Sequence, residues 1–450
     1  MVRVTDMTHG RPIRLILLFS LPLMLGSVFQ QLYTIVDTII IGRGVGMQAL
    51  ASIGAADWIN WLVLWGLQGF TQGFAILAAQ EFGAGAYDRL RRVLAMIVKL
   101  SCWFGIAVTI ISLLLVRPLL TLLHTDPAVF GGAQTYLYVQ FGGSLIIIAY
   151  NMAAAVLRCL GDSRTPLFAI IAASFANIAL DLLFVMGFGW GIFGASFATV
   201  LAQLIAFLLC LRSLRRLPFV QLTKADWKTD PAILLHLCRL GIPTGLQMSM
   251  ITLGGMVLQS VLNGFGVVFV AGYTAANKLY GILESASVAF GYAMTAYMGQ
   301  NRGARNAARI DAGIRAVLVL SAEFTVAIVT AMLLAGKPLL GLFLSTEEAG
   351  AADALAVAYQ YLMVLMAFLF ALFMLQAYRS SLQGLGEMTV PTLSGFAEML
   401  MRMGAALVLP TFIGQSGVFF AEGAAWGCAA ALNLVWYYMR IGKIKRDMLK

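Results

Sequence analysis

The chain has 450 residues, of which 61% are hydrophobic and only 11% are charged. One water-soluble core cannot bury so much apolar side chain, so the composition excludes a soluble globular protein and indicates a polytopic membrane protein. The net charge is +10, and in a membrane protein its meaning depends on where the basic residues lie along the chain. The five cysteines are scattered and form no C-x-x-C pair, so they support neither a disulfide framework nor a zinc site.

Twelve apolar runs are long enough to cross a bilayer, which takes roughly 20 helical residues. The first run is too long for a signal peptide and is followed by Asp37 instead of a cleavage site of small residues. The sequence therefore predicts an all-α polytopic membrane protein with twelve transmembrane helices and no room for a soluble catalytic domain. The runs cover residues 13–36, 53–79, 93–116, 133–157, 166–188, 192–212, 233–262, 267–298, 313–335, 355–382, 390–413 and 418–440.

Lys and Arg residues are concentrated at both ends of the chain and in the connections that follow the even-numbered runs. These positions hold 25 of the 30 basic residues, whereas the opposite connections hold only Arg43, Arg117 and Lys337. Loops rich in Lys and Arg stay on the cytoplasmic side of a membrane. We therefore expect a multi-pass protein of the inner or plasma membrane with both termini in the cytoplasm, and no nucleic-acid partner.

The two halves of the chain repeat one another. Gln80-x-x-Gly83 recurs as Gln300-x-x-Gly303, and Leu160-Gly161-Asp162 recurs as Leu385-Gly386-Glu387. Two six-helix bundles related by a pseudo-two-fold axis along the membrane normal enclose a central cleft, which is typical of secondary transporters and also compatible with a channel. We expect an N-terminal six-helix lobe over residues 1–212, a cytoplasmic linker over residues 213–232 and a C-terminal six-helix lobe over residues 233–450.

Acidic residues inside the apolar runs each cost about 2.5–3.5 kcal/mol on insertion scales, so each needs a partner or a function. Glu398 precedes Arg402 by four residues, which predicts a self-neutralising pair on one helix face. Glu284 follows Tyr280 by one turn, and the two are candidates for a secondary cation or substrate site, with a structural role as the alternative. The embedded acids are Asp37, Asp181, Glu284, Glu323 and Glu398.

The positions of Asp37 and Asp181 converge. Asp181 and Thr199 each lie nine residues from the turn near Trp190, hence about 13 Å below it. Asn177 lies one turn deeper on the face of Asp181, and Asp37 lies near the outer end of the first helix. These oxygen groups suit Na⁺, or H⁺ if one carboxyl keeps a proton beside its like-charged neighbour. A hydrogen-bonded polar plug between helices is the structural alternative.

The second half has no equivalent set of oxygen ligands. By the repeat, Leu258, Arg402, Ala406 and Cys428 take the places of Asp37, Asn177, Asp181 and Thr199. A requirement of the fold alone would recur in both halves, so the asymmetry favours a function.

Methionine is frequent, with 22 residues, and its flexible side chain suits either core packing or an adaptable wall for apolar ligands. Gly189-Trp-Gly191-Ile-Phe-Gly194 matches G-x-G-x-x-G but follows no strand, and no P-loop occurs, so neither a nucleotide site nor direct use of ATP is expected. The candidates for a substrate cavity are Tyr33, Gln30, Gln247, Met248, Met363 and Met366.

These motifs resemble the multidrug and toxic compound extrusion (MATE) family, DinF-like branch, of the MOP flippase superfamily. The resemblance extends over essentially the whole chain and rests on Gln30-Gln31-Leu-Tyr33-x-x-x-Asp37-Thr38, Gln80-x-x-Gly83, Leu160-Gly161-Asp162-x-x-x-Pro166 and Asn177-x-x-x-Asp181. It implies two lobes that alternate between inward-facing and outward-facing states, with a cation-coupling site at Asp37, Asn177, Asp181 and Thr199. NorM-like members use acids on the seventh and tenth helices, whereas residues 233–262 and 355–382 contain no Asp or Glu.

From the residues and the resemblance we expect an H⁺- or Na⁺-coupled antiporter that exports organic, mainly cationic amphipathic compounds by alternating access. The alternative is a flippase for a lipid-linked saccharide or another lipid, although only Lys278 and Arg402 are embedded basic residues. No D-D-x-x-D motif of a prenyl-transferring enzyme occurs. We expect no enzymatic activity, no cofactor beyond the coupling ion, and a monomer that interacts with the bilayer and small organic substrates.

Overall fold

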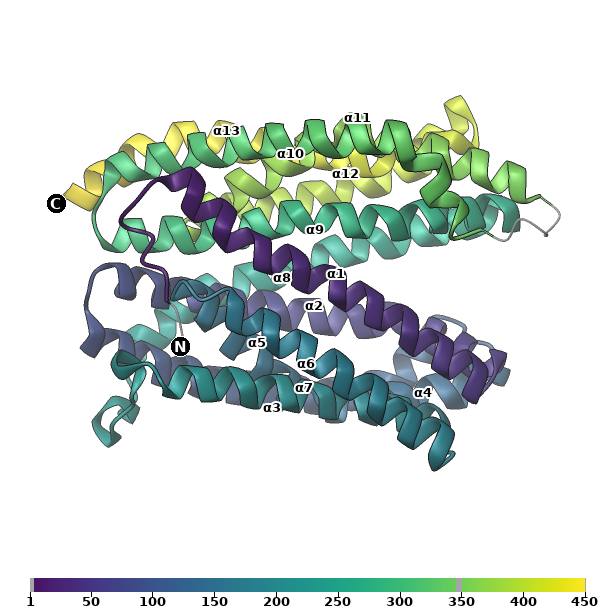
Figure 1. Ribbon diagram of the computed structural model, residues 1–450, viewed down its shortest axis with the longest axis horizontal. Coiled ribbons are helices and arrows are strands. Elements are labelled where there is room, and N and C mark those ends of the chain that lie inside the picture. Colours follow the sequence, from purple (N-terminus) through teal and green to yellow (C-terminus); the bar gives the residue numbers. More distant parts are fainter. Residues whose placement is uncertain (1–3, 345–349, 450) are drawn as a thin grey trace. The chain divides into compact units, whose positions relative to one another are not determined.

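The structure is a computed structural model that describes residues 4–344 and 350–449 (Figure 1). The described residues form helices joined by turns and contain no β-strand. The α-helices are α1 (Pro12–Gly44), α2 (Met47–Gly83), α3 (Tyr87–Leu122), α4 (Pro127–Gly142), α5 (Ser144–Cys159), α6 (Arg164–Asp181), α7 (Gly191–Arg215), α8 (Pro231–Leu262), α9 (Val267–Gly303), α10 (Ala307–Gly341), α11 (Ala351–Gly384), α12 (Thr389–Ile413) and α13 (Phe420–Leu449). The shorter segments are η1 (Leu182–Gly187), η2 (Pro218–Val220), η3 (Lys224–Trp227), η4 (Asn263–Phe265) and η5 (Gln415–Phe419).

Each of the twelve predicted spans corresponds to a helix or a pair of helices. Ten spans of the described chain are long and apolar enough to cross a membrane, and α4 and α5, which meet at a 50° bend, form an eleventh together. α9 is 37 residues long but less apolar, since it carries Lys278 and Glu284. The prediction of an all-α polytopic fold is therefore confirmed.

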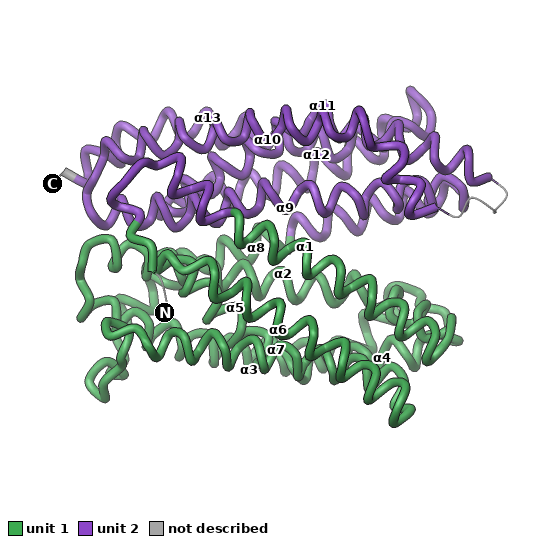
Figure 2. The backbone as a smooth tube through the Cα atoms, viewed as in Figure 1, with its two compact units in different colours: residues 1–6, 21–249 green, residues 7–20, 250–450 purple. Residues whose placement is uncertain are grey.

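The chain divides into two compact units, one of residues 1–6 and 21–249 and one of residues 7–20 and 250–450 (Figure 2). We call them unit 1 and unit 2. The boundaries pass through α1 after Ser20 and through α8 after Ser249, so the compact units and the predicted lobes divide the chain at different residues. The start of α1 belongs to unit 2 because the preceding Met7 amide donates to Gln300 Oε1 at 2.8 Å and the Ser20 hydroxyl donates to the Ala289 carbonyl at 3.3 Å.

The first half of α8 packs closely against α2 inside unit 1. A Cβ atom added to Gly73 would lie 2.6 Å from both the Gly241 Cα atom and the Leu240 carbonyl oxygen. Glycine at this position therefore allows the two backbones to approach, as small residues do between membrane helices.

Gly73→Ala is expected to lower the melting temperature of the purified protein, because the methyl group forces two backbones apart at a cost of about 1–3 kcal/mol. Gly54 lies on the same helix, and nothing lies within 4 Å of the Cβ that an alanine would add there. Gly54→Ala is the matched control and is expected to leave the melting temperature unchanged or to raise it, since alanine favours a helix. Equal melting temperatures for the two variants in detergent would contradict the close approach.

The predicted linker is held against α3 in unit 1. Lys99 Nζ donates to the Trp227 carbonyl at 2.5 Å, and the Asp226 carboxylate accepts from the Thr223 amide and hydroxyl at 2.7 Å each. Burial raises the pKa of Asp226, but the hydrogen bonds from Thr223 and the charge of Arg91 outweigh it and hold this pKa below its ordinary value. The stabilisation is therefore present above the ordinary carboxyl pKa and is lost as the pH falls through the lower, folded-state pKa.

Candidate functional site

Three carboxyl groups gather in unit 1, and we call them the carboxylate cluster: Asp37 on α1, Asp57 on α2 and Asp181 at the end of α6. Asp37 and Asp181 lie within hydrogen-bonding reach of each other, and the charge of Asp37 acts on Asp57. None of the three acids forms an ion pair with another residue that the structure describes. The cluster therefore places uncompensated negative charge among apolar helices.

Apolar packing brings these carboxyl groups together. Ile41 of α1, Val185 of η1 and Ala195 of α7 belong to one buried hydrophobic cluster. Asp37 lies one turn before Ile41, and Asp181 lies one turn before Val185. The contact between the ends of α1 and η1 thus carries Asp37 toward Asp181.

Asp181 is the last residue of α6 before the six residues of η1, which are a π-helix. π-helical turns contain more residues than α-helical turns and are frequent at functional sites. The predicted depth of Asp181 below the turn at Trp190 requires α-helical rise throughout. Because a π-helix rises less per residue, Asp181 lies closer to that turn than the sequence predicts.

The buried polar atoms of α6 lack partners. Asp181 is 0% exposed and Asn177 is 1% exposed. Apart from the mutual contact of the two carboxyls, Asp37 Oδ1, both Asp181 carboxylate oxygens and both polar side-chain atoms of Asn177 make no hydrogen bond in the described structure. Unpaired buried charges and amides are costly, and within the described residues these groups do not satisfy one another by hydrogen bonds. A proton or cation would supply what these oxygens lack.

Thr199 of α7 is half-buried, and its hydroxyl donates to the Ala195 carbonyl at 3.1 Å instead of to Asp181. Its oxygen keeps a lone pair for a further interaction. Among the residues in the described ranges, no group of three His, Cys, Asp or Glu side chains is arranged around a common metal position.

Asp57 lies inside the predicted run 53–79, although it was not predicted to be an embedded acid. Near it, Asn60 Nδ2 donates to the Tyr136 hydroxyl at 3.4 Å. The charge of Asp37 acts on both Tyr33 and Tyr136. α2 and α4 therefore contribute polar groups beside the carboxylate cluster that sequence motifs alone did not reveal.

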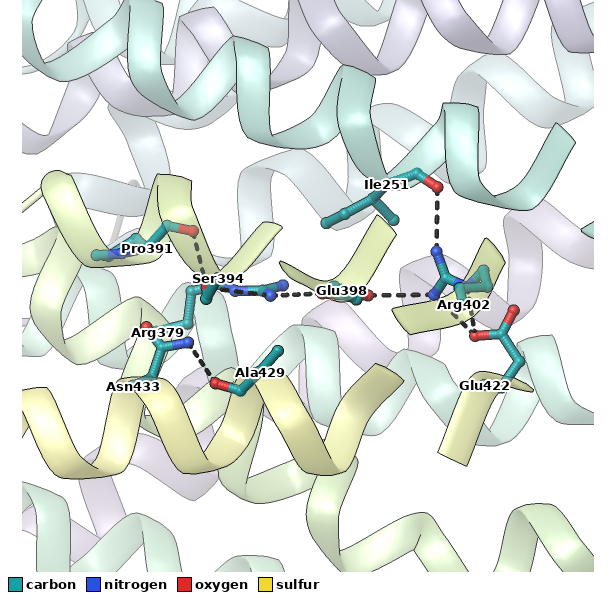
Figure 3. Close-up of polar contacts among 9 residues, drawn as sticks. All are labelled: Ile251, Arg379, Pro391, Ser394, Glu398, Arg402, Glu422, Ala429 and Asn433. Atoms are coloured by element: carbon teal, nitrogen blue, oxygen red, sulfur yellow. Dashed lines mark hydrogen bonds and ion pairs between the residues drawn. The ribbon is translucent and has the colours of Figure 1, made fainter. Parts of the chain in front are cut away.

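Unit 2 contains a chain of buried ion pairs in place of a carboxylate cluster (Figure 3). Glu398 accepts from Arg379 at 2.5 Å and from Arg402 at 3.1 Å, and Arg402 donates onward to Glu422 at 2.8 Å. Figure 3 also shows Arg402 Nη1 donating to the Ile251 carbonyl of α8, at 3.1 Å. We call Arg379, Glu398, Arg402 and Glu422 the ion-pair chain. The predicted Glu398–Arg402 pair is confirmed and proves to be its central link.

Arg379 corrects the sequence prediction. It was expected in a basic cytoplasmic connection but is a buried residue of α11, 4% exposed, whose charge is balanced by Glu398 of α12. The desolvation penalty of such a charge is offset only where it is paired and hydrogen-bonded in good geometry. The pairing joins two helices, so spacing within one helix does not reveal it.

Tyr280 and Glu284, the candidates for a secondary site, lie near one another on α9 in unit 2. Glu284 and the Tyr280 hydroxyl lie within electrostatic reach of each other, and the Tyr280 ring stacks on Trp426 with centroids 5.4 Å apart. Glu284 lies within electrostatic reach of Arg402 and Glu422. Because the ion-pair chain is itself balanced, Glu284 remains an acid of unit 2 without a cation of its own among the described residues.

The candidates for a substrate cavity lie in both units. Gln247 is 0% exposed and Met366 is 5% exposed, so neither is accessible in this conformation. Gln30 is exposed, and Tyr33, Met248 and Met363 are half-buried. Their role in substrate binding stays a prediction. Those of unit 1 are Gln30, Tyr33, Gln247 and Met248, and those of unit 2 are Met363 and Met366.

Comparison with known sequences identifies relatives over the whole chain. The MatE family model matches residues 22–183 and 243–408. The chain is 32% identical to the probable multidrug resistance protein YpnP of Bacillus subtilis (strain 168), over 99% of this chain and 98% of that protein. It is 23% identical to the multidrug export protein MepA of Staphylococcus aureus (strain NCTC 8325 / PS 47), over 94% of this chain and 93% of that protein.

Solved structures share the fold. A MATE protein in complex with MaL6 superimposes with a TM-score of 0.90 at 24% identity, covering 99% of this chain and 100% of that one. A MOP superfamily transporter from Pyrococcus furiosus also has a TM-score of 0.90 at 24% identity, covering 98% and 99%. At this identity the likeness shows the fold alone, and it confirms the predicted twelve-helix architecture.

Proposed function

Because this chain belongs to the MatE family of transporters, we propose that it is a cation-coupled antiporter that exports organic compounds by alternating access. Relatives named multidrug resistance or multidrug export proteins support the export of varied compounds, and we propose that these are mainly cationic and amphipathic. The protein acts as a transporter and not as an enzyme. It uses no cofactor beyond its coupling ion, which is H⁺ or Na⁺.

The observation that carries the proposal is the uncompensated carboxylate cluster. Asp37 and Asp181 lie within hydrogen-bonding reach of each other, Asp181 is fully buried, and none of the three acids has a basic partner among the described residues. Inside a membrane such charges persist only if a proton or cation accompanies them. This requirement supports a reversible cation site at the cluster.

In the proposed mechanism Asp37 and Asp181 bind the coupling cation. Asn177 provides its amide oxygen and Thr199 its hydroxyl oxygen as further ligands for Na⁺, or one carboxyl takes up H⁺ and donates a hydrogen bond to the other. Neutralising the cluster removes the repulsion between α1 and α6 and allows their ends to rearrange. Cation binding and substrate binding exclude each other, so cation entry drives substrate out.

The membrane potential supplies the driving force. An inward elementary charge moving through 100 mV releases about 2.3 kcal/mol, which sustains a substrate gradient of roughly fifty-fold per ion. This is sufficient for export without ATP.

The proposed orientation follows the distribution of basic residues. Both termini lie in the cytoplasm, and the protein spans the inner or plasma membrane as a monomer. The outer ends of α1 and α6, near which the carboxylate cluster lies, then open toward the outside, where Na⁺ or H⁺ is taken up.

Efflux from sealed proteoliposomes tests the proposal. A fluorescent organic cation is loaded, and inward Na⁺ and H⁺ gradients are imposed separately. We expect one gradient to accelerate efflux and the other to have no effect, which also identifies the coupling ion. Efflux that ignores both gradients, or gradient-independent transfer of a lipid-linked saccharide between leaflets, would contradict antiport and favour the flippase.

We further propose that Tyr280 and Glu284 form a secondary binding site for the positive charge of the substrate. Glu284→Gln is then expected to raise the KM for a cationic substrate about tenfold while kcat is retained, because a charge-assisted contact contributes about 1.5–3 kcal/mol. Tyr280→Phe, which keeps the carboxylate, is the matched control with a smaller effect. An unchanged KM in Glu284→Gln would show that Glu284 serves only to complete the packing against the ion-pair chain.

A further inference from the structure

One end of unit 2 contains an open, positively charged pocket that the proposed transport cycle does not use. Its volume is about 390 Å³, and it lies where α9 turns into α10, where α11 turns into α12, and beside the last turns of α13. Every residue that lines it belongs to unit 2. Six of these residues are charged: Arg302, Arg305, Arg440, Lys443, Glu387 and Asp447.

The protein does not neutralise this pocket. Four basic groups face two acidic groups, and none of the six forms an ion pair with another residue of the described ranges. Glu387 and Asp447 interact electrostatically with Arg302, but at distances too long for an ion pair. By contrast, Lys445, which is also on α13 but does not line the pocket, forms an ion pair with Asp311. An excess of positive charge is therefore left for an external anion.

Arg440 is held in a position to bind such an anion. Its guanidinium group lies 5.1 Å from the centre of the Trp436 ring, which fixes its plane through a cation–π contact. Its Nε atom is buried and has no acceptor among the described groups. Arg440 lines the pocket without a carboxylate partner among the described residues, and its planar, forked set of donors has the geometry by which arginine recognises phosphate.

The internal repeat shows that the fold does not require an open pocket here. The corresponding turn of unit 1, Leu160-Gly161-Asp162, is covered by the N-terminal segment: the Thr5 amide donates to the Gly161 carbonyl at 3.1 Å. A Cβ atom on Gly161 would lie only 2.1 Å from the Thr5 carbonyl oxygen. Asp162 is 2% exposed and accepts from the amides of Arg164 and Thr165. The equivalent turn of unit 2 instead lines the charged pocket.

We infer that the pocket formed by Arg302, Arg305, Arg440 and Lys443 binds a phosphate-bearing anion. The phosphate group belongs to the headgroup of an anionic phospholipid or to a soluble phosphate compound. In the proposed orientation the pocket lies on the cytoplasmic side, where basic pockets between membrane helices bind anionic headgroups. The inference does not depend on the transport reaction, so it stands or fails separately from the proposed function.

Binding is tested with delipidated full-length protein in detergent. Phosphatidylglycerol, phosphatidylcholine and inorganic phosphate are titrated separately, and the melting temperature and the bound lipid in native mass spectra are recorded. We expect phosphatidylglycerol or inorganic phosphate, but not phosphatidylcholine, to raise the melting temperature, because a ligand of the native state stabilises it. Phosphatidylglycerol alone identifies a lipid headgroup, and inorganic phosphate identifies a soluble source.

The variant Arg440→Gln/Lys443→Gln is expected to bind the effective anion at least about tenfold more weakly. Arg446→Gln is the matched control, because Arg446 is an exposed cation of the same helix that does not line the pocket. Melting temperatures without ligand show that the double variant folds, since removing mutually repelling charges does not destabilise it. Equal binding by the wild type and both variants, or no response to either anion, would overturn the inference.

Discussion

Asp37→Asn is expected to abolish coupled efflux while leaving the protein folded and inserted. The amide has nearly the same shape as the carboxyl and mimics its protonated form, so the carboxylate cluster is permanently neutralised and no longer exchanges a cation. The substrate gradient that proteoliposomes sustain under 100 mV should fall from roughly fifty-fold to about onefold. Efflux of a fluorescent cation and the amount of inserted protein are measured together.

Substitutions of two other acids, Asp181 and Glu323, show whether the loss of coupled efflux is specific to the carboxylate cluster. Asp181→Asn is expected to reproduce the loss, because Asp181 is fully buried and lies within hydrogen-bonding reach of Asp37. Glu323→Gln is the matched control: Glu323 is also an acid of a predicted span, but its side chain is exposed on α10 and lies outside the cluster. It should transport like the wild type. Wild-type coupling in Asp37→Asn would disprove the proposed role of the cluster.

Glu398→Ala is expected to cause the largest loss of stability of any single substitution in unit 2. It leaves Arg379 buried without its carboxylate, and breaking a buried pair in this way costs about 3–5 kcal/mol. Arg402 suffers less because it keeps Glu422. Thermal unfolding in detergent should show a clearly lowered melting temperature, together with reduced yield of inserted protein.

Two further variants separate lost pairing from lost packing. Arg379→Met/Glu398→Leu removes both charges and should recover much of the stability, since apolar replacement of a buried pair is often neutral or favourable. Asp311→Ala breaks the partly exposed pair with Lys445 and should cost less than about 1 kcal/mol. If Glu398→Ala and Asp311→Ala lowered the melting temperature by the same amount, the ion-pair chain would not stabilise unit 2.

The contrast between Glu398 and Arg379 shows how far prediction from sequence reaches. The Glu398–Arg402 pair was predictable because its partners are four residues apart on one helix, where spacing fixes geometry. Arg379 and Glu422 join the same chain from α11 and α13. Their participation depends on how three helices are rotated about their axes, and no local pattern specifies that rotation.

The sequence by itself determined the features that arise from local chemistry: apolar runs produce the helices, the repeat pairs the two halves of the chain, and Asp37 and Asp181 stand out because charge is costly inside a membrane. Only the tertiary structure decided which groups meet. It added Asp57 to the cluster and left a basic pocket at one end of unit 2. It also placed the start of α1 in unit 2 and the start of α8 in unit 1, whereas the predicted lobes place each helix whole in the other lobe. The reason is that burial preference is a property of each segment, whereas contact between side chains depends on packing between segments far apart in the chain.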